Sequence, residues 1–142
     1  MSISVTICAD SQRKPIPEWT QGLGFGKYFS DHMFMMDYEE GVGWQNPRVV
    51  PYQSLTMDPA AMCLHYGQEI FEGMKVYRGE NNHVYGFRPR DNFARMSRSA
   101  QRLVMPKLDE EAAFQGLCEL VRADERWIPP KHGYALYIRP TM

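Results

Sequence analysis

The stretch that decides the fold class is MKVYRGENNHVYGF, residues 74–87, in which two runs rich in valine and tyrosine flank a polar loop. Branched and aromatic residues favour β-strands, and a short loop of glycine and asparagine favours a tight turn between them. Residues 74–78 and 83–87 are therefore predicted to pair as a β-hairpin.

Two amphipathic helices are expected after this hairpin. Apolar side chains recur three or four positions apart between residues 91 and 104, and again between residues 109 and 123. Asp109 stands at the start of the second segment, where the helix dipole favours an anion. One shared core is predicted to bury both apolar stripes, namely Phe93, Met96, Ala100 and Leu103 of the first helix and Phe114, Leu117 and Val121 of the second.

The remaining segments complete a small α/β (α+β) domain. Prolines and glycines interrupt residues 1–30, which are expected to form an irregular N-terminal arm with at most one short strand. Strands are predicted at residues 32–38, 48–52 and 133–139, and a short helix at residues 59–66 with Asp58 as its cap. Because strands come mostly first and helices lie between them, the expected architecture is a mixed sheet with two main helices packed on it.

The composition favours one soluble domain. The chain has 142 residues, 44% of them hydrophobic and 23% charged, and a net charge of −1, so no general attraction to nucleic acid or anionic lipid is expected. The three cysteines are odd in number and far apart, and the four histidines lack metal-ligand spacing. Reduced thiols, a cytoplasmic location and no metal site are therefore expected. No apolar run approaches the roughly 20 residues of a membrane-spanning helix.

Tyr137 and Arg139 are the first candidate pair for chemistry. Side chains alternate between the two faces of a strand, so these residues share one face of the predicted last strand. An arginine fork matches a carboxylate, and the phenol adds another donor. The alternative interpretation is that this face is the solvent side of the sheet, where charged residues are common.

A row of arginines is the second candidate. Arg95, Arg98 and Arg102 are spaced to lie on one side of the predicted 91–104 helix, and Arg88 and Arg90 lie just before them. Near a helix N-terminus such a row can bind phosphate, because free backbone N–H groups attract anions there. The row can equally be a solvated surface, and the nearly neutral overall charge disfavours nucleic-acid binding.

Residues 65–73 mix polar, aromatic and glycine residues within one short stretch. Gly67 and Gly73 permit a positive φ or a close approach of the backbone. Glu69 and Glu72 are expected to be solvated, as acidic side chains usually are.

The longer motifs resemble one family, the branched-chain amino-acid aminotransferases, in the longer version found in eukaryotes and many bacteria. The resemblance extends from about residue 20 to the end of the chain and rests on the order and spacing of the motifs. They are GKYFSDHM (26–33), GW (43–44), LHYGQEIFEGMK (64–75), FRP (87–89), NFARMSRSA (92–100), WIP (127–129) and LYIRP (136–140).

The resemblance implies a pyridoxal 5′-phosphate enzyme with the D-amino-acid aminotransferase type of fold. In that family a small N-terminal domain and a larger C-terminal domain enclose the cofactor. The protein is expected to be a homodimer or higher homo-oligomer in which two subunits share each site. The implied reaction moves the amino group of leucine, isoleucine or valine to 2-oxoglutarate, with a lysine that holds the cofactor as a Schiff base.

The resemblance also implies roles for residues of this chain. Arg95 looks like the contact of the small domain with the cofactor phosphate, which leaves Arg98 and Arg102 as structural or surface residues. Arg139 would hold the side-chain carboxylate of glutamate. The implied substrate residues are the carboxylate pair Tyr137 and Arg139, the apolar walls Phe29 and Phe71, and Tyr66, which reaches into the site of the partner subunit.

The lysines depart from the family pattern. None stands in the context of the cofactor lysine, which in this family lies well beyond position 142; the lysines are Lys14, Lys27, Lys75, Lys107 and Lys131. Residues 31–142 are therefore expected to be a truncated small N-terminal domain without the cofactor-lysine domain, with no cofactor bound and inactive alone. Two alternatives stay open: a relative of D-amino-acid aminotransferase or aminodeoxychorismate lyase, and a non-catalytic dimerisation module.

Overall fold

The computed structural model describes residues 2–20 and 22–142; Met1 and Gln21, which belong to the predicted N-terminal arm, lie outside the described residues. In chain order the elements are β1 (Ser4–Val5), the 3₁₀-helix η1 (Asp10–Gln12), β2 (His32–Glu39), β3 (Gly43–Pro51), α1 (Met62–Tyr66), β4 (Met74–Arg78), β5 (Val84–Gly86), α2 (Pro89–Arg102), α3 (Glu110–Ala123), the 3₁₀-helix η2 (Glu125–Trp127) and β6 (Leu136–Ile138). The α/β class and the two main helices are confirmed, and the strands divide into two three-stranded sheets.

The first sheet has the order β1-β3-β2 and is mixed, because β1 runs parallel to β3 and β2 runs antiparallel to it. The predicted strand pair around a glycine-containing turn is confirmed, but β3 begins at Gly43, before the predicted residue 48. Gly41 and Gly43 have φ values of 82° and 95°, a conformation that favours glycine, so the turn closes soon after Glu39.

The second sheet has the order β5-β4-β6 and is antiparallel throughout. Its β4–β5 pair is the hairpin that the sequence predicts. The last strand is shorter than the predicted residues 133–139, because Gly133 has a φ of 84° and the Tyr134 N–H closes a turn onto the Lys131 carbonyl.

The starts of α2 and α3 follow from signals in the sequence, whereas the start of α1 does not. Pro89 occupies the first turn of α2, where its missing N–H costs nothing. Asp109 precedes α3, and its carboxylate accepts a hydrogen bond of 3.0 Å from the Ala112 N–H. The predicted cap of α1 is wrong: Asp58 accepts from the Ala60 N–H in the preceding turn, and the helix begins only at Met62.

The predicted burial of Leu103 is also wrong. Helix α2 ends at Arg102, and Val104 has a φ of 56°, so the chain turns away and leaves Leu103 39% exposed. Ser97 takes the fourth buried position on the helix instead.

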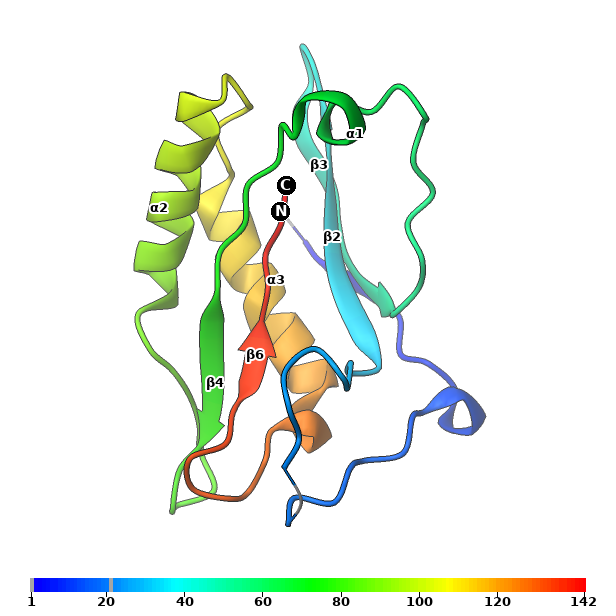
Figure 1. Cartoon of the computed structure of the whole chain (residues 1–142), viewed down its shortest axis with the longest axis vertical. Coiled ribbons are helices and arrows are strands. Elements are labelled where there is room, and N and C mark those ends of the chain that lie inside the picture. Colours follow the sequence, from blue (N-terminus) through cyan, green and yellow to red (C-terminus); the bar gives the residue numbers. More distant parts are fainter. Residues whose placement is uncertain (1, 21) are drawn as a thin grey trace.

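One hydrophobic core joins the helices to both sheets. Figure 1 shows α3 passing behind β6, with α2 to one side and β2 and β3 to the other. At Gly116 the helix α3 comes so close to β2 that an added Cβ would lie 2.2 Å from the Phe34 ring. The buried core residues are Ile70, Met74, Phe93, Met96, Ala100, Leu108, Ala113 and Leu117, with Phe114, Val121 and Ile138 among the partly buried side chains around them.

Leu117→Ala is expected to lower the free energy of unfolding by roughly 2–5 kcal/mol, because it leaves a cavity in this core. Leu103→Ala is the matched control: the side chain lies at the exposed end of α2, and we expect a loss below about 0.5 kcal/mol. Urea denaturation of both variants measures the difference. Equal losses would contradict the assignment of the core.

Candidate functional site

A cavity of about 610 Å³ lies where α2 faces β4 and β6. Four cations line it, Lys75 from β4, Arg88 at the start of α2, and Arg95 and Arg98 within α2. Asp91, the one carboxylate among the lining residues, is paired with Arg88. The cavity is therefore strongly cationic and attracts anions.

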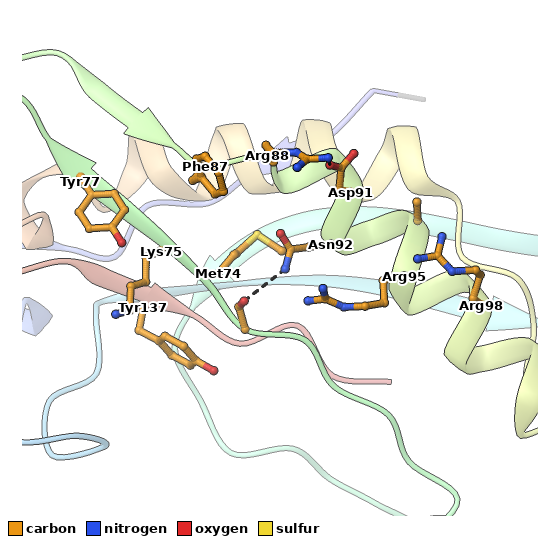
Figure 2. Close-up of a pocket in the computed structure, with 12 residues that line it drawn as sticks. Met74, Lys75, Tyr77, Phe87, Arg88, Asp91, Asn92, Arg95, Arg98 and Tyr137 are labelled. Atoms are coloured by element: carbon orange, nitrogen blue, oxygen red, sulfur yellow. Dashed lines mark hydrogen bonds and ion pairs between the residues drawn. The ribbon is translucent and has the colours of Figure 1, made fainter.

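The strand register decides which side chains face this cavity. Lys75 lies directly opposite Tyr137, and Met74 lies opposite Ile138. Opposite residues of an antiparallel pair share a face. Met74 and Ile138 therefore pack in or against the core, with Met74 also reaching the cavity wall, while Lys75 and Tyr137 line the cavity from the other face. Figure 2 shows Lys75 and Tyr137 across the cavity from α2. The face that carries Tyr137 therefore borders a cavity as well as solvent.

Arg95 is held by a buried carboxylate. Its Nε and Nη2 atoms donate to Oε1 and Oε2 of Glu72, both at 2.6 Å. The Glu72 side chain is only 6% exposed, and Asn92 Nδ2 donates to its Oε2 at 2.9 Å. The expectation that Glu72 is solvated is therefore wrong, because these donors satisfy the carboxylate inside the protein.

The ion pair keeps both partners charged. The Arg95 guanidinium holds the pKa of Glu72 below its ordinary value, against the opposing effect of burial and with help from Asn92. The Glu72 carboxylate in turn raises the pKa of Arg95. At neutral pH the cavity thus contains a fixed guanidinium cation.

One edge of the Arg95 guanidinium stays available. Nε and Nη2 bond to Glu72, whereas no described residue accepts a hydrogen bond from Nη1. Figure 2 shows the side chain extending from α2 toward the side of the cavity where Tyr137 lies. Guanidinium N–H groups bind phosphate oxygens well, and Lys75, which lines the same cavity, adds positive charge. The donor set therefore fits a phosphate group.

Three of the residues singled out in the sequence come together beside the cavity. Arg139 Nε donates to Tyr137 Oη at 3.1 Å, and the guanidinium carbon lies 4.4 Å from the centroid of the Phe71 ring. A backbone bridge between Phe71 and Thr141 brings this ring to the end of β6. Because the phenol oxygen accepts the Arg139 bond, the Tyr137 O–H is left to donate to a ligand.

The position of the Tyr137 hydroxyl is fixed from several sides. An added Cβ at Gly73 would lie 2.2 Å from Tyr137 Oη, so the absent side chain makes room for the phenol. Phe25 packs edge-on against the Tyr137 ring, with 5.0 Å between centroids. Gly73, Phe25 and Arg139 together hold the hydroxyl at the cavity wall.

The other two implied substrate residues lie apart from this group. Phe29 stacks on Tyr52 with 5.4 Å between ring centroids. Tyr66 ends α1 and is 78% exposed, followed by Gly67 with a φ of 57°. The described contacts do not join either residue to Tyr137.

Some residues of the site were not predicted from the sequence, among them Lys75 and Phe25. The alternation rule that selects Tyr137 would also have selected Lys75, which lies between the buried Met74 and Val76. Arg88, Arg95 and Arg98 of the predicted arginine row line the cavity, although the resemblance leaves Arg98 as a structural or surface residue. Phe25 belongs to an irregular segment without periodicity, and no local signal marks it.

The described residues contain no candidate metal site and no helix that could span a membrane. Within residues 2–20 and 22–142, no group of three or more histidine, cysteine, aspartate or glutamate side chains could hold a metal ion. The helices of the same residues are all too short or too polar to span a bilayer. Cys8, Cys63 and Cys118 are free thiols, as expected.

No protein-family model matches the chain. Among curated proteins, branched-chain-amino-acid aminotransferase 2 of Bacillus subtilis is 52% identical over 130 residues, which cover 92% of this chain and 36% of that protein. The mitochondrial branched-chain-amino-acid aminotransferase of Rattus norvegicus is 41% identical over 140 residues, which cover 99% of this chain and 35% of that protein. The solved branched-chain amino acid aminotransferase of Thermobaculum terrenum, in its PLP form, gives a TM-score of 0.52 at 26% identity and covers 66% of this chain and 29% of that one.

These similarities agree with the ordered motifs and extend over nearly the whole chain. The chain spans about a third of the length of the relatives it matches. In sequence and in fold the chain is therefore similar to about one third of a branched-chain amino-acid aminotransferase.

Proposed function

We propose that this chain provides a phosphate site and a substrate-carboxylate site of a branched-chain aminotransferase, which moves the amino group of leucine, isoleucine or valine to 2-oxoglutarate. The observation that carries this proposal is that Arg95, clamped by Glu72, and Tyr137, bonded to Arg139, line or border the same cationic cavity. The curated relatives that support it are themselves named for the branched-chain amino acids.

The proposed cofactor is pyridoxal 5′-phosphate, and the related enzyme of Thermobaculum terrenum was solved in its PLP form. The Nη1 edge of Arg95 would bind the phosphate, and Lys75, Arg88 and Arg98 would add positive charge around it. When bound, this cofactor supplies an electron sink for the amino-acid substrate. The lysine that carries it is proposed to belong to the part of the relatives that this chain does not span.

The proposed substrate residues satisfy two opposite needs of one pocket. Tyr137 and Arg139 offer an O–H and a guanidinium to a carboxylate. Phe71, which packs on Arg139, offers an apolar wall to a branched side chain. Phe29, which stacks on Tyr52 apart from this group, is proposed as a second wall. Glutamate and leucine can thus occupy the same place in turn.

We further propose that residues 1–30 are an arm on a small domain formed by residues 31–142, in a cytoplasmic homodimer or higher homo-oligomer. Tyr66, Phe71 and Phe87 are 78%, 58% and 75% exposed. Such exposed aromatic side chains support the proposal that another domain or subunit covers parts of this surface. The large domain and the partner subunit are the proposed covers, with Tyr66 reaching into the partner's site.

A chimeric enzyme tests the proposal. In it, this chain replaces the matching third of aminotransferase 2 of Bacillus subtilis, with which it is 52% identical. We expect the chimeric enzyme to transfer the amino group of leucine, isoleucine and valine to 2-oxoglutarate. Activity toward D-alanine instead, or a folded chimera that binds the cofactor and is inactive with all four amino acids, would contradict the proposal.

The 142-residue chain alone is expected to show no transamination. Incubation with pyridoxal 5′-phosphate and borohydride is expected to fix no stoichiometric pyridoxyl label, even on Lys75, the lysine that lines the cavity. Peptide mass spectrometry measures the label. A stoichiometric label on Lys75 would show that this chain carries its own cofactor lysine.

A further inference from the structure

Glu72 lies behind the phosphate site and is not among the residues that line the cavity. We propose that Glu72 is a positioning residue that fixes Arg95 with its Nη1 edge toward the cavity, so that phosphate binding depends on this buried anion. The inference rests on the proposed function of Arg95 and deepens it.

Hydrogen bonds join Glu72 to two other parts of the fold, the segment after β6 and helix α2. Its backbone N–H donates to the Pro140 carbonyl at 3.0 Å, just after β6. Asn92 of α2 bridges the Glu72 carboxylate and the Gly73 carbonyl, at 2.9 and 3.2 Å. The carboxylate is therefore a fixed anchor, and its two oxygens dictate the plane of the Arg95 guanidinium.

The negative charge of Glu72 and its ordering of Arg95 have opposite effects on phosphate binding. Glu72 is an anion near a site for anions, so by charge alone its removal should strengthen phosphate binding. An unclamped arginine has many rotamers, and ordering it opposes binding. Arg95 is also 59% exposed along its side chain, so without Glu72 solvent offers it many competing positions. We infer that the ordering of Arg95 by Glu72 affects phosphate binding more than the repulsion between Glu72 and phosphate does.

Glu72→Gln separates these two effects. It removes the charge and one of the two acceptor oxygens that hold Arg95, and it keeps the shape of the side chain. Loss of a supporting partner behind a ligand-binding group typically weakens binding by ten- to a hundredfold at metal sites, and we expect roughly tenfold weaker phosphate binding here. Glu69→Gln is the matched control, because Glu69 is exposed in the same segment; we expect unchanged or slightly tighter binding.

The experiment titrates inorganic phosphate into the 142-residue chain and follows the Arg95 Nε–H signal by NMR. In the unchanged chain this signal is expected to be protected from exchange by Glu72, and to shift on phosphate addition. In Glu72→Gln the protection is expected to be lost and the dissociation constant to rise. In an Arg95→Gln background, where the backbone amide signals of α2 are followed instead, Glu72→Gln is expected to cause no further weakening, because Glu72 acts only through Arg95.

The outcomes separate the two claims. If phosphate leaves the Arg95 signal of the unchanged chain unmoved, the proposed function of Arg95 fails and this inference fails with it. If phosphate binds at Arg95 but Glu72→Gln binds it equally or more tightly, only the positioning role is overturned. If Glu72→Gln does not fold, Asn92→Ala removes a hydrogen bond that holds the Glu72 carboxylate and is expected to weaken phosphate binding by at least about threefold. Unchanged binding in that variant would overturn the inference.

Discussion

Replacing Arg139 by alanine in the chimeric enzyme is expected to lower kcat/KM for glutamate and 2-oxoglutarate by roughly ten- to a hundredfold, and for leucine much less. Arg139 uses Nε to hold Tyr137, and none of the described residues accepts from its terminal nitrogens. Those nitrogens can bind the second carboxylate of glutamate, whereas leucine brings only an apolar branch. A lost charge-assisted contact costs about 1.5–3 kcal/mol, which gives the expected factor.

Steady-state kinetics with each amino acid and each 2-oxo acid measure this selectivity. Arg102→Ala is the matched control: Arg102 is an exposed arginine at the end of α2 that does not line the cavity, and its loss should change neither substrate. Equal losses for leucine and glutamate in Arg139→Ala would mean that Arg139 binds the carboxylate common to both substrates.

Asp31→Ala is expected to lower the free energy of unfolding by roughly 3–5 kcal/mol. Its side chain is 2% exposed and accepts hydrogen bonds from the Lys14 N–H at 2.9 Å, from Trp127 Nε1 at 2.9 Å, and from Arg126 Nη2 at 2.7 Å. Alanine would leave these donors without an acceptor, including the indole N–H of the buried Trp127. The N-terminal arm would also lose one of its links to the residues after α3, whereas the bond from Arg126 Nη2 to the Lys14 carbonyl would remain.

Asp37→Ala is the control for burial. Asp37 is also paired with an arginine, Arg48, but its side chain is 44% exposed, so a loss of at most about 1 kcal/mol is expected. Denaturant unfolding of both variants under the same conditions compares them. A loss below about 1 kcal/mol for Asp31→Ala would show that the buried network contributes little.

The effect of Asp31 should depend on pH. Burial alone would raise the pKa of Asp31, but hydrogen bonds from Trp127, the Lys14 N–H and Arg126 hold it below its ordinary value. A carboxyl with a lowered folded-state pKa stabilises fully above its unfolded pKa, about 3.9, and this contribution is lost as the pH falls further. The gap between the unchanged chain and Asp31→Ala should therefore be constant near neutral pH and narrow below about pH 4.

Local patterns predict the parts of this fold that local forces decide. The hairpin of β4 and β5 follows from β-branched and aromatic runs around a turn, and α3 follows from its period and from Asp109. The wrong prediction for Leu103 arises because the period continues through Val104, whereas the backbone turns there. The end of a helix depends on the path of the chain that follows it. The spacing of apolar residues within the helix carries no information about that path.

The candidate site likewise contains some contacts that the sequence could predict and others that it could not. Tyr137 and Arg139 could be paired from strand alternation, because they are two positions apart on the predicted strand 133–139, although the observed strand ends at Ile138. The clamp on Arg95 joins residues 23 positions apart, and the Asp31 network joins Asp31 to Trp127, 96 positions away. No spacing rule reaches over such distances, so the burial of Glu72 emerges only from the folded chain.

The central claim is that Arg95, anchored by Glu72, binds the cofactor phosphate beside the Tyr137–Arg139 pair. Its most direct test is a crystal structure of the chimeric enzyme grown with pyridoxal 5′-phosphate. We expect a phosphate oxygen within about 3 Å of Arg95 Nη1, while Nε and Nη2 remain on Glu72. A phosphate bound away from α2, with Arg95 bonded to Glu72 and solvent only, would contradict it.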